Sequence, residues 1–158
     1  MKVSGIDAAR EFAPRTGRTL ERKVLVTGFS QGGTAATGLA RALAAGADGW
    51  FRLGALSPIA GPYDGRRLVL PVLASMPPPF NTGYTAYLLV SYNRLHHIYD
   101  KPSDVFEKEG VEEVFDGVHT GEDLAETLGG SVDELLTPRG KALIENPTGP
   151  FAAALAVH

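Results

Sequence analysis

The chain has 158 residues, the length of one ordinary domain, and 44% hydrophobic with 21% charged residues is a typical globular composition. Its 15 basic and 18 acidic residues leave a net charge of −3, which argues against a nucleic-acid partner. The absence of Cys excludes disulfides, thiolate metal sites and a cysteine nucleophile. No apolar run is long enough to predict a membrane span, and no basic start followed by an apolar stretch predicts a signal peptide.

The chain is predicted to open with a helix. Ile6, Ala9 and Phe12 stand at near-helical spacing, which predicts a helix over 6–16. Gly17 follows directly and is expected to end it.

A strand–helix–strand unit is predicted next. Val24–Thr27 is a short β-branched apolar run between charged residues and a glycine, which is typical of a buried strand. The stretch from Gln31 to Ala45 is rich in Ala and Leu and predicts a helix. Phe51–Leu56 predicts a second strand, closed by the Ser-Pro pair that follows it. This spacing has the size of a βαβ unit and implies a parallel pair of strands.

The second half of the chain is predicted to be helical. Helical spacing predicts one helix over 80–99 and another over 104–115. Ser131 and Glu134 have the spacing of a capping box, and a last helix is expected over 151–157. Because no alternating apolar run occurs after residue 65, few or no further strands are expected there.

One short motif points to chemistry. Residues 28–32 read Gly-Phe-Ser-Gln-Gly and match G-x-S-x-G, the nucleophile elbow. In an elbow the serine occupies a strained turn between a strand and a helix, so that its hydroxyl projects clear of the sheet. Both required elements are predicted around Ser30, at the junction between Thr27 and Gln31. The alternative is a glycine-rich turn in which Ser30 only caps the helix.

The neighbours of Ser30 fit the same interpretation. Strand and helix approach closely at an elbow, and Gly28, Gly32 and Gly33 are expected to give them the room. The backbone N–H of Gln31 opens the predicted helix, where the helix dipole favours negative charge. It is therefore a candidate oxyanion donor.

With this motif in its context, the chain resembles α/β-hydrolases of the bacterial esterase and secreted-lipase kind. The resembling segments are 24–42, 53–64 and 84–151, the last as a helical cap inserted after a strand. The resemblance implies ester hydrolysis through an acyl-enzyme, with Ser30 as nucleophile and the N–H of Gln31 as half of the oxyanion hole. It also leans towards a secreted protein.

The chain departs from the pattern of that family. The fold orders its triad as Ser, then an acid, then His, on later strands that are not recognisable here. Only 29 residues precede Ser30, and no HGGG-type loop is among them. The expectation is therefore an internal piece of a longer hydrolase, almost inert when isolated.

Four histidines are candidates for an internal base. His96 and His97 lie on the predicted helix over 80–99 and are expected to be surface or half-buried helix residues. Asp116 and His119 form an acid–histidine pair on one tight loop, which could serve a triad only if that loop reached the serine. His158 is the terminal residue and is not expected to be held in place.

Two further clusters have ordinary interpretations. Acidic residues crowd the stretch 107–126, and a solvated face is expected there rather than a metal site. Four tyrosines could line an acyl pocket, but their helical spacing favours a place in the core: Tyr84, Tyr87, Tyr92 and Tyr99.

The sequence thus predicts an α/β fold: part of an α/β-hydrolase parallel sheet in residues 1–64 and a helical cap in 65–158. The predicted function is serine-dependent carboxylic ester hydrolysis on a hydrophobic small-molecule ester, without cofactor or metal. The alternatives are a serine peptidase of the prolyl-oligopeptidase type and a non-catalytic, truncated hydrolase domain.

Overall fold

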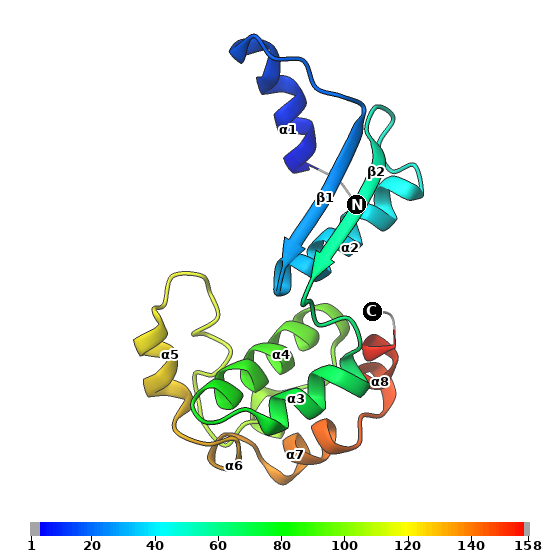
Figure 1. Ribbon diagram of the computed structural model, residues 1–158. Helices are drawn as coiled ribbons and strands as arrows, with labels where there is room; N and C mark the ends of the chain where they lie inside the picture. Colours follow the sequence, from blue (N-terminus) through cyan, green and yellow to red (C-terminus); the bar gives the residue numbers. More distant parts are fainter. Residues whose placement is uncertain (1–3, 157–158) are drawn as a thin grey trace. The chain divides into compact units, whose positions relative to one another are not determined.

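The computed structural model describes residues 4–156 and divides into two compact units, Met1–Tyr63 and Asp64–His158 (Figure 1). We call them unit 1 and unit 2. Unit 1 holds the parallel sheet, and unit 2 is built from helices.

Unit 1 begins with a helix that is shorter than expected. α1 spans Ser4–Phe12, and a 3-10 turn over Ala13–Thr16 continues it. Gly17 then closes the turn with a φ of +68°, a left-handed conformation that glycine adopts without steric cost. The predicted helix over 6–16 is therefore confirmed as two consecutive pieces.

The predicted βαβ unit is confirmed, with longer strands. β1 spans Lys23–Phe29, α2 spans Gln31–Ala44 and β2 spans Arg52–Ile59, and the two strands pair in parallel. The expectation that the Ser-Pro pair closes β2 is wrong, because Pro58 lies within the strand opposite Gly28. A sheet of two strands consists of edges only, and proline is tolerated on an edge because its missing N–H breaks no ladder.

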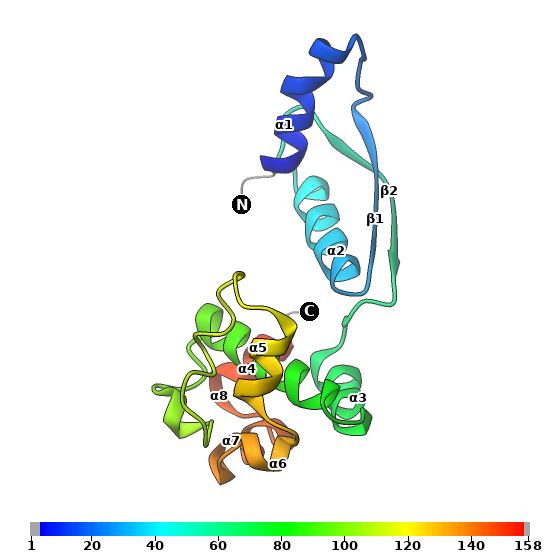
Figure 2. The same ribbon diagram turned by 90° about the vertical axis from the view of Figure 1, so that its left-hand side faces the viewer.

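The two faces of this sheet differ. Figure 2 shows α1 and α2 on the same side of β1 and β2. On that side a small core forms from Val26, Ala36, Leu43 and Phe51. The other face carries exposed apolar side chains, among them Leu25 (80% exposed), Phe29 (72%) and Ile59 (50%). Parallel sheets normally have both faces covered, so this open face is unusual.

Unit 2 is a cluster of short helices around one long one. α4 spans Phe80–His96 and packs against α3, α5, α6 and α8. The remaining helical segments are a π-helical turn at Gly65–Val69, α3 (Leu70–Ser75), a 3-10 turn at Pro102–Asp104, α5 (Gly121–Leu128), α6 (Val132–Leu135), α7 (Pro138–Glu145) and α8 (Gly149–Leu155). The core contains the fully buried Leu89, Phe106, Leu135 and Phe151.

The predicted absence of further strands is confirmed for the described part of unit 2, where pairing is limited to one isolated bridge, Phe106 with Leu136. The same bridge explains why the predicted helix over 104–115 is wrong. Backbone hydrogen bonds from Glu107 N–H to the Leu135 carbonyl and from Thr137 N–H to the Val105 carbonyl pair residues 105–107 with 135–137, and residues 109–114 form turns. A cross-chain tertiary contact thus overrides the helical spacing.

Helix ends in unit 2 follow their capping residues. α4 ends at His96, three residues earlier than predicted, and His97 after it adopts a positive φ of 52°. The Ser131 hydroxyl accepts a hydrogen bond from the Glu134 N–H and starts α6, as the spacing predicted. The predicted last helix is α8, which starts two residues earlier, and Val157 lies outside the described residues.

Candidate active site

Ser30 occupies the predicted junction between strand and helix. It directly follows β1, caps α2, is exposed and has φ 54° and ψ −124°. A residue other than glycine pays about 1–3 kcal/mol for such a conformation, which persists only where the surrounding structure enforces it. The expected strain and outward position of Ser30 are therefore confirmed, whereas a chemical role for its hydroxyl is a proposal made below.

Backbone hydrogen bonds hold this turn on both sides. The Ser30 N–H donates to the Ile59 carbonyl at 2.9 Å, which extends the β1–β2 ladder by one step. The Gly33 N–H donates to the Ser30 carbonyl at 2.9 Å. The position of Ser30 is therefore set jointly by the end of β2 and the first turn of α2.

Gly28 makes the close approach of strand and helix possible. A Cβ atom at residue 28 would collide with the carbonyl carbon and oxygen of Gly32 and would lie 2.9 Å from the Gly33 nitrogen. These are backbone atoms, which cannot rotate away. The expectation that position 28 requires glycine is confirmed.

Gly33 is required by a different neighbour. Its Cβ would lie 2.5 Å from the Tyr63 Oη, 3.1 Å from the Ile59 carbonyl oxygen and 3.2 Å from the Gly61 Cα. The loop that follows β2 therefore lies directly against the first turn of α2. The sequence analysis did not single out Tyr63, and the turn signal of the preceding Gly-Pro pair was the indication available.

The expectation for Gly32 is wrong. A Cβ at residue 32 would meet no atom within 4 Å, and no positive φ distinguishes the residue. The Cβ position of Gly32 faces open space. The close approach to the strand is made instead by the Gly32 carbonyl, which occupies the space where a Cβ of residue 28 would lie. The second glycine of the motif is therefore not sterically required in this protein.

Gln31 is the first residue of α2, as predicted. The first N–H groups of a helix have no partner within the helix, and the positive end of the helix dipole lies there. Nothing further in the structure assigns the Gln31 N–H to an oxyanion.

One histidine of unit 2 is paired with an acid. His119 Nδ1 lies 3.0 Å from Asp116 Oδ1, which also accepts hydrogen bonds from the Val118 and His119 N–H groups. The hydrogen bond to Asp116 raises the pKa of His119, and the Val118 and His119 N–H groups lower the pKa of Asp116. The imidazole is thus oriented through Nδ1, as in an acid–histidine dyad. This pair belongs to unit 2, whereas Ser30 belongs to unit 1.

The remaining histidines match the simpler interpretation. His96 is partly buried, with its ring 5.7 Å from that of Tyr92, and His97 is exposed at the end of α4. His158 lies outside the described residues. Residues 1–63 contain no histidine, so unit 1 cannot supply an imidazole base from its own sequence.

The tyrosines divide into two groups. Tyr99 is buried, and Tyr92 packs edge-on against Phe151, so the core prediction is confirmed for these two. Burial and a hydrogen bond to Glu112 raise the pKa of Tyr99. The core prediction is wrong for Tyr84 and Tyr87, which lie on the outer face of α4 and are 53% and 42% exposed.

The acidic stretch over 107–126 performs local structural tasks. Glu112 accepts a hydrogen bond from the Tyr99 hydroxyl at 2.6 Å, and Asp123 accepts one from the N–H of Thr120, the residue that caps α5. Across residues 4–156, no three His, Asp or Glu side chains gather in a way that could hold a metal ion.

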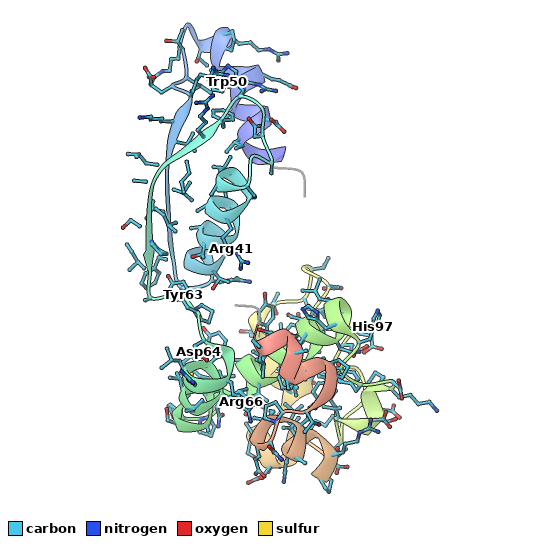
Figure 3. The ribbon with its side chains drawn as sticks, turned by 90° about the vertical axis from the view of Figure 1, so that its right-hand side faces the viewer. Arg41, Trp50, Tyr63, Asp64, Arg66 and His97 are labelled. Atoms are coloured by element: carbon cyan, nitrogen blue, oxygen red, sulfur yellow. The ribbon has the colours of Figure 1, made fainter. Side chains whose placement is uncertain are left out.

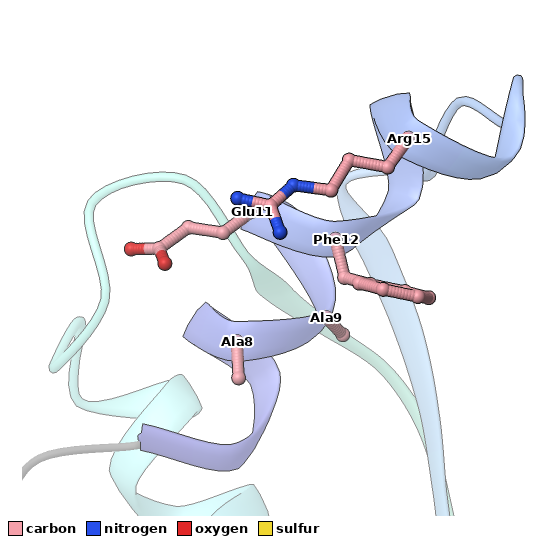
Figure 4. Close-up of a pocket in the computed structure, with 5 residues that line it drawn as sticks. All are labelled: Ala8, Ala9, Glu11, Phe12 and Arg15. Atoms are coloured by element: carbon pink, nitrogen blue, oxygen red, sulfur yellow. The ribbon is translucent and has the colours of Figure 1, made fainter.

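Two further features of the described residues do not involve Ser30. Within residues 4–156 no helix is long and apolar enough to cross a membrane. A shallow hollow lies along α1 and the turn after it, as Figure 4 shows, and it is lined by Ala8, Ala9, Glu11, Phe12 and Arg15. It does not include Ser30.

Two solved structures are similar to this chain. The rice cell wall degrading esterase LipA from Xanthomonas oryzae matches with a TM-score of 0.79 and 27% sequence identity, over 98% of this chain and 44% of the esterase. A protein from Legionella pneumophila, described as a hydrolase, matches with a TM-score of 0.79 and 21% identity, over 96% of this chain and 41% of that protein. This chain therefore spans less than half the length of each.

No protein-family model matches the chain, and no curated protein matches it. The structural likeness agrees with the fold expected from the sequence. The chain is a mixed α/β protein with a short parallel sheet, consistent with part of an α/β-hydrolase fold.

Proposed function

We propose that this chain carries the nucleophile of an ester hydrolase and that the nucleophile is Ser30. The observation that carries the proposal is the positive φ of Ser30, held between the end of a parallel strand and the start of a helix. A serine that only capped the helix would accept a hydrogen bond with its side chain, and no such cap bond forms at Ser30.

The surroundings of Ser30 suit an acyl transfer. The Ser30 oxygen would attack the carbonyl carbon of an ester, and the alcohol would leave with the proton that Ser30 gave to a base. Negative charge on the former carbonyl oxygen would develop at the start of α2, where the Gln31 N–H and the helix dipole would stabilise it. Water would then hydrolyse the acyl-serine and regenerate the hydroxyl.

The comparisons support the same class of reaction. The more similar of the two structures, at 27% identity, is an esterase, and the other is described as a hydrolase. We propose accordingly that residues 1–64 are the hydrolase portion and 65–158 a helical cap, with a carboxylic ester of hydrophobic acyl group as substrate.

The test separates the nucleophile from its base. A serine hydroxyl is a weak nucleophile near neutral pH without a base in hydrogen-bond reach. Because unit 1 has no histidine, the purified chain is treated with an activated acetyl ester in the presence of increasing free imidazole. Peptide mass spectrometry then measures acetylation of Ser30, with the exposed Ser103 as an internal control for non-specific transfer.

We expect imidazole-dependent acetylation of Ser30 that exceeds acetylation of Ser103 at least tenfold, and no transfer at this site in Ser30→Ala. Without imidazole we expect no hydrolysis above the Ser30→Ala background. Equal acetylation of the two serines at every imidazole concentration would refute the nucleophile assignment. Robust Ser30-dependent hydrolysis without imidazole would instead show a base within the chain, to be sought first with His119→Ala.

A non-catalytic domain is the competing function. Such a domain would need no base beside Ser30, and residues 1–63 contain no histidine. The imidazole experiment decides between the two, since a non-catalytic turn would leave Ser30 no more reactive than Ser103.

A further inference from the structure

The side chain of Tyr63 returns to the elbow from the loop that follows β2. Figure 3 shows Tyr63 at the end of unit 1 where α2 begins. Its phenol oxygen lies 2.5 Å from the place a Cβ of Gly33 would take, and its ring carbons Cε1 and Cζ lie 2.6 Å from the place a Cβ of Gly61 would take. The Tyr63 side chain therefore fills the space that two glycines leave empty.

This arrangement joins the loop to the helix. The Gly33 Cβ position is also within 3.2 Å of the Gly61 Cα and 3.1 Å of the Ile59 carbonyl oxygen. Ile59 is the residue whose carbonyl accepts the Ser30 N–H. The Tyr63 Oη thus lies beside the contact that connects the end of β2 to the first turn of α2.

Two strained residues depend on that connection. Ser30 has a φ of 54° and Ala60 a φ of 49°, and they follow the paired strand ends Phe29 and Ile59. Neither is glycine, so each conformation persists only where its surroundings enforce it. Tyr63 is the large side chain packed at this place, and the hydrogen bond from its own N–H to the Gly61 carbonyl turns it back towards the elbow.

Tyr63 contacts the two glycines with different atoms. Its Oη is the atom that lies nearest the Gly33 Cβ position on α2, whereas its ring carbons lie nearest the Gly61 Cβ position in the loop. The Oη is buried and has no hydrogen-bond partner among the residues that the structure describes, so it acts here by packing. Phenylalanine would keep the ring against Gly61 and remove the atom nearest Gly33.

We propose that Tyr63 is a positioning residue for the elbow: its side chain braces the first turn of α2 against the loop after β2 and thereby holds Ser30 in its strained conformation. The expected effect of Tyr63 on the reactivity of Ser30 rests on the proposed function, whereas its expected effect on the backbone of the turn does not. The two consequences are measured separately.

The catalytic measurement uses the imidazole-dependent acetylation of Ser30 at increasing ester concentration. In Tyr63→Ala we expect the limiting rate constant to fall at least tenfold, with the half-saturating ester concentration unchanged. Tyr63→Phe, which keeps the ring against Gly61 and loses the Oη beside Gly33, is expected to have a rate constant between those of Tyr63→Ala and the natural chain. The control is Leu43→Ala, which removes a buried side chain near the other end of α2. This variant is expected to have a lower melting temperature, but its acetylation rate constant, measured well below that temperature, should be unchanged.

The structural measurement is residue-resolved amide hydrogen exchange by NMR, which needs no reactivity. The Ser30 and Gly33 amides should exchange at least tenfold faster in Tyr63→Ala and at the natural rate in Leu43→Ala. In Tyr63→Phe, which loses only the Oη, the exchange rate should lie between those of the natural chain and Tyr63→Ala. Unchanged exchange in Tyr63→Ala, or equal acceleration in Leu43→Ala, would overturn the proposal. If no variant is acetylated but the exchange pattern is as expected, the role of Ser30 fails while the brace stands.

Discussion

The substitution Gly28→Ala tests the elbow most directly, because it adds one methyl group at the point of closest approach. That methyl would lie 2.9 Å from the Gly33 nitrogen, against an ordinary contact of at least 3.4 Å, and would overlap the Gly32 carbonyl more severely. The backbone must therefore move by at least 3.4 − 2.9 = 0.5 Å, which separates α2 from β1. Overpacking of this kind costs about 3 kcal/mol, and the lower backbone entropy of Ala in the unfolded chain returns about 0.5 kcal/mol.

The net loss of about 2.5 kcal/mol corresponds to a fall of about 10–20 °C in melting temperature for a unit of this size. Trp50 is the single tryptophan of the chain and lies in unit 1, so its fluorescence reports the unfolding of this unit. Gly32→Ala is the matched control: its methyl meets nothing within 4 Å, and alanine favours the helix, so stability should be unchanged or slightly higher. A Gly28→Ala protein as stable as the natural chain, or an equally destabilised Gly32→Ala, would refute this account of the turn.

Three further outcomes are expected. Ser30→Gly should raise the stability of unit 1 by about 1 kcal/mol in urea unfolding, because glycine adopts the positive φ at lower cost; an unchanged midpoint would argue against strain. Leu25→Lys, on the open sheet face, should change stability by less than about 0.5 kcal/mol but reduce binding of a hydrophobic dye, and undiminished dye binding would mean that this face is covered. Asp116 raises the pKa of His119. The pair therefore stabilises unit 2 fully at pH values below the ordinary histidine pKa, and this stabilisation is lost as the pH rises through the His119 pKa of the folded protein. NMR titration should show a lower His119 pKa in Asp116→Asn, and an unchanged pKa would contradict the pairing.

The sequence by itself determined the parts of this protein that depend on neighbouring residues. The parallel βαβ unit, the strained turn at Ser30 and the cap at Ser131 all follow from residue types within a few positions of one another. Their geometry is local, because glycines, capping hydroxyls and apolar spacing act on the backbone directly. The need for glycine at position 28 is of the same kind, since its contact is with the turn four residues on.

Tertiary contacts decided the rest. The stretch over 104–115 has helical spacing, but pairing of its Phe106 with Leu136 interrupts a helix there, and a partner thirty residues away is not visible in a local pattern. Gly32, which ends the motif, and its neighbour Gly33 look alike in the sequence, yet only Gly33 faces the loop that returns after β2. Tyr63 gains its place against the elbow from the same loop. Which side chains meet across such distances is set by packing, and packing exists only once the chain has folded.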